Sequence, residues 1–119
     1  MDERSLNNLI IPGWMVFEMK LNYSELRVYA LIYGFSQSGQ GEFYGSWQYL
    51  ADWCGIARNY VPEVLKSLQQ KGLLLRRTDM VVGKHGKPHK VVHYQAVIPD
   101  ELRKKLCSIL LKMRGKKIL

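Results

Sequence analysis

The sequence predicts an α+β fold, in which a three-helix core is followed by a β-hairpin and a C-terminal amphipathic helix. Three observations lead to this prediction. Two segments with apolar residues at helical spacing are joined by Gly55, two β-prone runs (73–82 and 90–98) surround a turn-forming segment, and another helical stripe begins after Pro99. A chain of 119 residues, 47% of them apolar, can bury one sizeable core. We therefore expect one domain over residues 1–98, including an N-terminal arm, and a C-terminal helix with a basic tail over residues 99–119.

The N-terminal segment 9–19 contains β-favouring residues around the pair Pro12-Gly13. We predict a short strand or an extended arm laid on the core. Its expected anchors are three large apolar side chains, Trp14, Val16 and Phe17. No apolar run in the chain approaches the roughly 18 residues of a membrane span, and the first residues are acidic. We therefore expect neither an export signal nor a membrane partner, and a cytoplasmic location.

The first clear helix is predicted to begin at Asn22, whose side chain can cap it together with Glu25 three residues later. Apolar side chains then cover most of the helix surface, which is typical of a central helix covered on two sides. The polar, glycine-containing loop 36–42 ends this helix. Beyond the loop, Phe43 and Tyr44 are expected to form a short strand against the base of the hairpin.

Residues 46–75 contain the two helical segments and the start of the hairpin. Ser46 is well placed to cap the first segment, and Gly55 can adopt the left-handed backbone that turns the chain sharply into the second. Lys71 and Gly72 form a typical helix end. The buried faces are predicted to consist of Leu50, Ala51 and Cys54 in the first helix and of Val61, Val64, Leu65 and Leu68 in the second.

Pro62 complicates the start of the second helix, because proline is tolerated only in the first turn of a helix. Two alternatives remain open. Either Asn59 caps a helix that begins just after it, so that its side chain is occupied by the helix end, or residues 58–62 are locally distorted.

The positive charge of the chain is concentrated in its second half. Residues 1–55 carry three Lys or Arg against six Asp or Glu, a net charge of −3, whereas residues 56–119 carry fifteen against four, a net charge of +11, which together give the formal +8. The boundary coincides with the start of the second helix. Such an asymmetry is expected of a nucleic-acid-binding face, because neutralised phosphates release their counterions.

The pattern S-x-x-x-L-A-x-x-x-G-I, followed by V-x-x-x-L-x-x-L-x-x-K-G-L-L and a hairpin, resembles the winged helix-turn-helix domains of bacterial transcriptional regulators and of phage or plasmid replication initiators. The preceding segment 11–37 is similar to the lead-in of replisome-organiser N-terminal domains. The resemblance implies sequence-specific binding of double-stranded DNA, at an operator or at a replication origin. A winged helix that serves as a protein–protein interaction module without specific DNA binding is the alternative.

This resemblance makes the outward side of the second helix, residues 58–71, a recognition surface. A rotation of about 100° per residue from Val61 puts Asn59, Glu63, Lys66 and Gln70 on the opposite side. Arg and Asn can bond purine edges in pairs, Glu can accept from cytosine, and Lys can reach phosphate or guanine. The candidate DNA contacts of the helix pair are Ser46, Gln48, Arg58, Asn59, Tyr60, Glu63, Lys66 and Ser67.

The turn of the hairpin carries a cluster of basic side chains. We predict a basic wing over residues 83–90, whose lysines contact phosphates or the minor groove and position the protein without reading its sequence. Its candidate contacts are Lys84, His85, Lys87 and Lys90. His85, His89 and His93 are not expected to bind a metal, because four residues of a strand span roughly 13 Å and metal ligands lie within about 2 Å of the ion.

No motif in the sequence indicates catalysis, and we expect no enzymatic activity, no cofactor and no small-molecule ligand. The sequence has neither a phosphate-binding G-x-x-x-x-G-K loop nor an H-E-x-x-H pair. Cys54 and Cys107 lie far apart within helical patterns, which favours two buried thiols in a reducing compartment over a disulfide.

The C-terminal helix is compatible with three arrangements. It can fold back on its own domain, pair with a second copy to give a homodimer that reads two half-sites, or rest on anionic lipid. The apolar stripe on which all three depend consists of Leu102, Leu106, Ile109, Leu110 and Met113.

Overall fold

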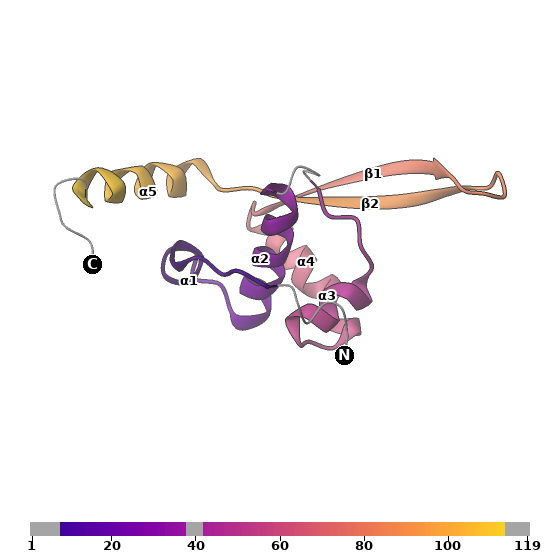
Figure 1. The fold of residues 1–119 in the computed structure, drawn as a ribbon, viewed down its shortest axis with the longest axis horizontal. Helices are drawn as coiled ribbons and strands as arrows, with labels where there is room; N and C mark the ends of the chain where they lie inside the picture. Colours follow the sequence, from indigo (N-terminus) through magenta and orange to yellow (C-terminus); the bar gives the residue numbers. More distant parts are fainter. Residues whose placement is uncertain (1–7, 38–41, 114–119) are drawn as a thin grey trace.

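The computed structural model describes residues 8–37 and 42–113 and confirms the predicted α+β fold class. In chain order, the elements are α1 (Gly13–Glu18), α2 (Tyr23–Gln37), α3 (Trp47–Cys54), a 3-10 turn (Arg58–Tyr60), α4 (Val61–Gln70), β1 (Leu74–Val82), β2 (Pro88–Ala96) and α5 (Asp100–Met113). Figure 1 shows the hairpin and α5 extending to opposite sides of the other helices. The molecule is accordingly elongated, with extents of 60 × 35 × 26 Å.

Helix α2 lies in the middle of the helical core and packs against α1, α3, α4 and β2. Its residues 28–32 are buried without interruption, which confirms the prediction of a helix covered on more than one side. The predicted apolar faces of α3 and α4 are buried as well. The remaining buried apolar side chains are Met15, Phe43, Leu73, Leu74 and Ala96.

Residues 13–18 form helix α1, so the predicted strand is wrong, and an arm laid on the core is found only before this helix, where Leu9 and Ile11 pack against the core. Pro12 has an extended backbone (φ −64°, ψ 153°), and its carbonyl accepts the first hydrogen bond of α1 from the N–H of Met15 at 3.0 Å. Met15 is fully buried and Trp14 packs against the core, but Val16 and Phe17 are exposed by 45% and 76%. In a helix, only one side of this segment faces α2. The packing of that side against α2 outweighs the β propensity of the segment's residues.

The predicted capping box opens α2. Asn22 Oδ1 accepts a hydrogen bond from the N–H of Glu25 at 2.9 Å, and Glu25 Oε1 accepts from the N–H of Asn22 at 3.2 Å. The carboxylate of Glu25, a residue only 3% exposed, also accepts from Ser67 Oγ at 2.5 Å and from Lys71 Nζ at 2.7 Å. Burial by itself raises the pKa of Glu25, but these hydrogen bonds and the charge of Lys71 outweigh burial and lower it. Glu25 therefore ties the start of α2 to the end of α4.

The turn between α3 and α4 has the predicted form. Ser46 caps α3 through its side-chain oxygen, and Gly55 follows the helix in the left-handed region with φ +66°. The guanidinium of Arg27, in α2, donates to the carbonyls of Trp53 and Cys54 at 3.1 Å each. These carbonyls belong to the last turn of α3, where the helix itself supplies no donor. Helix α2 thus fixes the end of α3 from the side.

The second helix begins later than predicted. A 3-10 turn, Arg58–Tyr60, precedes α4, in place of one continuous helix over 58–71. Pro62 lies in the first turn of α4, where the missing N–H costs no helical hydrogen bond. Local distortion is therefore the correct alternative. Capping by Asn59 is wrong, because Tyr60 stands at the N-cap position and no side chain caps the helix there.

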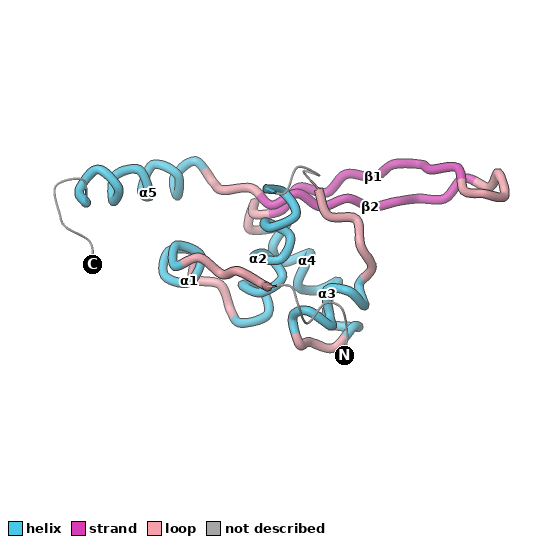
Figure 2. The backbone as a smooth tube through the Cα atoms, in the orientation of Figure 1, coloured by secondary structure: helices cyan, strands magenta, loops and turns pink. Residues whose placement is uncertain are grey.

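Strands β1 and β2 form an antiparallel hairpin, which Figure 2 shows as a long arm leaving the helices. Strand β2 begins at Pro88, two residues earlier than predicted, and Gly86 (φ +73°) lies in the turn 83–87. At the base of the hairpin, Phe43 and Tyr94 exchange two backbone hydrogen bonds of 2.7 Å. The short strand predicted at 43–44 is reduced to this single bridge.

Helix α5 points away from the core, and none of its described residues is buried. The arrangement in which α5 folds back to bury its apolar stripe is therefore wrong. Near its start, Lys105 Nζ lies 2.7 Å from a carboxylate oxygen of Glu18 in α1.

Cys54 is buried as predicted, but Cys107 is exposed on α5. The predicted basic tail after Met113 lies outside the described residues, among which no helix is long and apolar enough to cross a membrane.

Candidate nucleic-acid interface

The outward side of α4, together with the 3-10 turn before it, is open to solvent. Its opposite side is filled by the four buried residues of α4, so the helix presents one apolar and one polar face. The polar face carries the predicted base-reading candidates, and every one of them is exposed. They are Arg58, Asn59, Tyr60, Glu63 and Lys66.

Three other predicted DNA contacts have partners within the fold. The hydroxyl of Ser46 accepts a hydrogen bond from the N–H of Tyr49 at 3.1 Å and serves as a helix cap. Gln48 Nε2 donates to Asp52 Oδ1, one turn along α3, at 2.7 Å. Ser67 donates to the buried carboxylate of Glu25, so its hydroxyl faces α2 and not the outward side of α4.

The basic side chains of the hairpin lie at and near its tip. Lys84, His85 and Lys87 are in the turn, whereas Lys90 is in β2, paired with Met80 of β1. All four predicted contacts of the wing are exposed. The tip is the part of the hairpin farthest from the helices, as Figures 1 and 2 show. Side chains at the base of the hairpin are therefore needed to connect the tip with α4.

A groove of about 460 Å³ provides this connection, and we call it the hairpin groove. It runs from the start of α3 and the 3-10 turn along the hairpin, from Arg76 near the base to Lys90 farther out. Among the described residues, three aromatic residues and three cations line it, and no carboxylate does. The lining residues are Tyr44, Gly45, Ser46, Trp47, Arg58, Arg76, Lys90, Val91, Val92 and Tyr94.

Arg76, Tyr44 and Trp47 of the hairpin groove are absent from the predicted contacts. Arg76 pairs with Tyr94 across the hairpin, and side chains of directly paired residues point to the same face of a sheet. Because side chains alternate between the two faces of a strand, the sequence could have placed Arg76 on the same face as residues 78 and 80. Whether Lys90 of β2 lies on that face as well depends on the strand register, which the length and shape of the turn determine. Tyr44 and Trp47 do not belong to any helical or strand-like repeat of apolar residues, so no sequence pattern indicated them.

The other side of the hairpin base is neutralised. Arg77 donates to Glu42 at 3.1 Å and also pairs with Asp79, and His93 Nε2 lies 3.3 Å from Asp79. By contrast, no carboxylate in the described part of the chain forms an ion pair with Arg58, Arg76 or Lys90. Among the described residues, the cations available to a ligand at the hairpin base therefore lie on the groove side.

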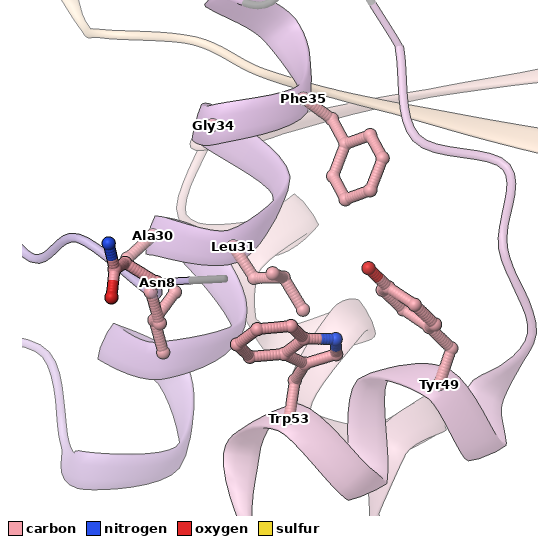
Figure 3. Close-up of a pocket in the computed structure, with 8 residues that line it drawn as sticks. Asn8, Ala30, Leu31, Gly34, Phe35, Tyr49 and Trp53 are labelled. Carbon is pink, nitrogen blue, oxygen red and sulfur yellow. The ribbon is translucent and has the colours of Figure 1, made fainter. Parts of the chain in front are cut away.

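A second hollow, of about 320 Å³, lies between α2 and α3. Figure 3 shows Tyr49 and Trp53 of α3 facing Leu31 and Phe35 of α2 across it. Among the described residues that line this hollow, none is charged, so they offer a phosphate no counter-charge. In residues 8–37 and 42–113 there is also no group of three His, Cys, Asp or Glu side chains that could hold a metal ion.

Comparison with known proteins identifies a similar fold but no family. No protein-family model matches the chain, and no curated protein sequence matches it. Among solved structures, the fold is similar to that of a chain described as the N-terminal domain of a DNA-binding protein, with a TM-score of 0.51 and 15% sequence identity. The superposition covers 100% of this chain and 96% of that one.

Proposed function

We propose that this protein binds double-stranded DNA in a sequence-specific manner, as transcriptional regulators and replication-initiation proteins do, and that it does so in the cytoplasm without catalysing a reaction. The outward face of α4 would enter the major groove, and the hairpin would follow the backbone or the minor groove. The observation that carries the proposal is the hairpin groove, because it joins Arg58 beside α4 to Arg76 and Lys90 of the hairpin in one surface lined by no carboxylate. The solved structure with the similar fold belongs to a DNA-binding protein, which supports the same class of ligand.

The proposed DNA-contacting side chains fall into two groups, those that can read base edges and those that contact phosphates. Arg58, Asn59, Glu63 and Lys66 project from the first turns of the recognition segment and can read base edges. The lysines of the hairpin contribute charge and position the protein on the phosphates. We leave Ser67 out of the contact set, because its hydroxyl is committed to Glu25.

The test begins with selection of bound sequences from a random duplex pool, followed by binding measurements on the selected site over a range of salt concentrations. Lys87→Ala should weaken binding to all sequences alike and lower the salt slope by about one, whereas Lys66→Ala should relax the preference at one base pair by about 1 to 3 kcal/mol. Lys104→Ala is the matched control, because it removes the same charge from an exposed position on α5. Equal effects of Lys87→Ala and Lys104→Ala, or a selected pool without any consensus, would contradict the proposal.

We also propose that α5 pairs with α5 of a second copy. Its apolar stripe is only partly covered by the described part of the chain, and Leu110 of the stripe and the neighbouring Leu111 are exposed by 67% and 65%. A two-fold dimer would set two recognition helices on two half-sites. Sedimentation should then show a mass that rises with concentration, and Leu110→Lys should keep the protein monomeric, whereas a wild-type chain that is monomeric throughout would contradict pairing.

A further inference from the structure

The hairpin groove contains aromatic residues that contact with the phosphate backbone of a duplex does not require. Cations suffice to follow phosphates, but the groove is also lined by aromatic residues, among them Trp47 and Tyr94. Trp47 is 43% exposed, whereas the ring of Tyr44 lies against that of His93, with 5.7 Å between the ring centres. In an intact duplex, the flat faces of the bases are covered by their neighbours in the stack. Exposed rings beside cations are what proteins use to hold bases that have left the stack.

The rings of the groove are held in defined positions. Trp47 is the first residue of α3, directly after the capping Ser46, and the guanidinium carbon of Arg58 lies 5.8 Å from the centre of its ring. Tyr94 is tied to Phe43 by the two bridge hydrogen bonds of 2.7 Å. Because these groups need little ordering, a base that stacks on them loses little of its binding energy to conformational entropy.

The approach to Trp47 is fixed by Gly45 as well. A Cβ atom on this glycine would lie 2.6 Å from the Phe43 ring, so the backbone between the bridge and the cap packs closely on an aromatic core residue. Phe43 itself is 2% exposed. Residues 44–47 therefore form one wall of the groove, in which position 45 has no room for a side chain. The volume of about 460 Å³ also falls in the range of small-ligand sites, roughly 300–1,000 Å³.

We propose that the hairpin groove accepts an unpaired nucleotide of a DNA strand, with the base stacked on Trp47 and the phosphate beside Arg76 and Lys90. Arg58 lies over the Trp47 ring, and the base stacks on the ring face that Arg58 leaves free. This function goes beyond duplex binding by α4. It would let the protein hold a single strand, or a nucleotide displaced from a duplex, at the base of the hairpin.

The experiment follows the intrinsic fluorescence of the full chain during titration with a twelve-nucleotide thymidine oligonucleotide. The chain contains three tryptophans, and stacking of a base should quench Trp47. Trp47→Ala should weaken binding of the oligonucleotide by about 5-fold to 100-fold, as expected for the loss of one base–aromatic stack, and should abolish the quenching. Trp47→Phe should abolish the quenching but keep the affinity within about 3-fold, because a ring face remains.

Tyr23→Ala provides a matched control. Tyr23 is also an exposed aromatic residue, by 64%, with an arginine over its ring, since Arg27 lies 5.1 Å from the ring centre. It belongs to α2 and does not line the hairpin groove. This variant should bind the oligonucleotide like the wild type. Circular dichroism and a urea midpoint for each variant establish that it is folded.

A fully paired hairpin DNA, titrated in parallel, separates this proposal from duplex binding. An equal loss of oligonucleotide and duplex affinity in Trp47→Ala would show that Trp47 contacts paired and unpaired DNA alike, and would overturn the proposal. It is also overturned if Trp47→Ala binds the oligonucleotide like the wild type, or if Trp47→Phe loses as much affinity as Trp47→Ala. Sequence-specific duplex binding is judged on the selected pool and on Lys66→Ala, Lys87→Ala and Lys104→Ala, so either proposal can fail alone.

Discussion

Replacement of Glu25 by alanine should destabilise the protein by about 2 to 3 kcal/mol, because one buried carboxylate holds together α2 and α4. Three groups donate to it, the N–H of Asn22, the hydroxyl of Ser67 and the ammonium of Lys71. Loss of the capping contact costs about 1 kcal/mol, and a partly buried hydroxyl left without an acceptor costs about 1 to 1.5 kcal/mol. Lys71 adds at most about 1 kcal/mol, since it is a surface partner whose side chain is 46% exposed and can regain water.

The pH dependence of stability gives a second measure of the same interaction. The pKa of Glu25 lies below its ordinary value of 4.5, because the hydrogen bonds from Lys71 and Ser67 outweigh the opposing effect of burial. A carboxylate with a lowered pKa in the folded state stabilises the fold above the pKa of the unfolded chain, and this contribution is lost as the pH falls through the folded pKa. Glu25→Gln keeps the shape but removes the charge. Its difference from the wild type should therefore be largest near neutral pH and shrink below a pH of about 4.

Urea denaturation at a series of pH values measures both effects, with Glu101→Gln as control. Glu101 is exposed in the first turn of α5, and its replacement should change the free energy of unfolding by less than about 0.5 kcal/mol. The reasoning would be refuted if Glu25→Ala stayed within about 0.5 kcal/mol of the wild type, or if the difference between Glu25→Gln and the wild type were the same at neutral and acidic pH.

Three further predictions concern packing and reactivity. Gly45→Ala should lower the free energy of unfolding by about 1 to 3 kcal/mol, because its Cβ atom would lie 2.6 Å from the ring of Phe43; a urea midpoint equal to that of the wild type would contradict this. Gly34→Ala should raise it by about 0.5 to 1 kcal/mol, since the new methyl group in α2 meets nothing within 4 Å; a lower thermal midpoint would count against this. At neutral pH, a thiol reagent should modify only Cys107 in the native protein and both cysteines in denaturant, because burial raises the pKa of Cys54 to about 11, against the opposing charge of a nearby arginine. Two reactive thiols in the native state would refute the burial of Cys54.

The local features of the helix pair were predictable from the sequence because each depends on residues close together in the chain. A capping side chain needs a backbone N–H two or three residues away, and a left-handed turn needs a residue without a Cβ atom. Ser46, Gly55 and the pair Asn22 and Glu25 meet these conditions and have the predicted geometry. The buried faces of α3 and α4 were predictable for the same reason, since helical spacing alone puts their apolar residues on one side.

The segment 9–19 shows where this kind of reasoning fails. Its β-favouring residues predicted a strand, yet Pro12 starts a helix whose Met15 fills a site on the core. A six-residue helix has little stability of its own, and packing against α2 decides its form. Likewise, the sequence left two alternatives at Pro62, and the tertiary structure selected the 3-10 turn before α4.

The sequence by itself determined the order of helices and hairpin, the caps and turns that separate most of them, and the basic character of the second half, because short-range spacing and composition encode these properties. Only the tertiary structure decided that Ser67 serves Glu25 and not the outer face of α4, and that Arg76 and Lys90 share a groove with Trp47 and Arg58. Such groupings join residues far apart in the chain. They depend on strand register and on the angles between helices, which no local pattern specifies.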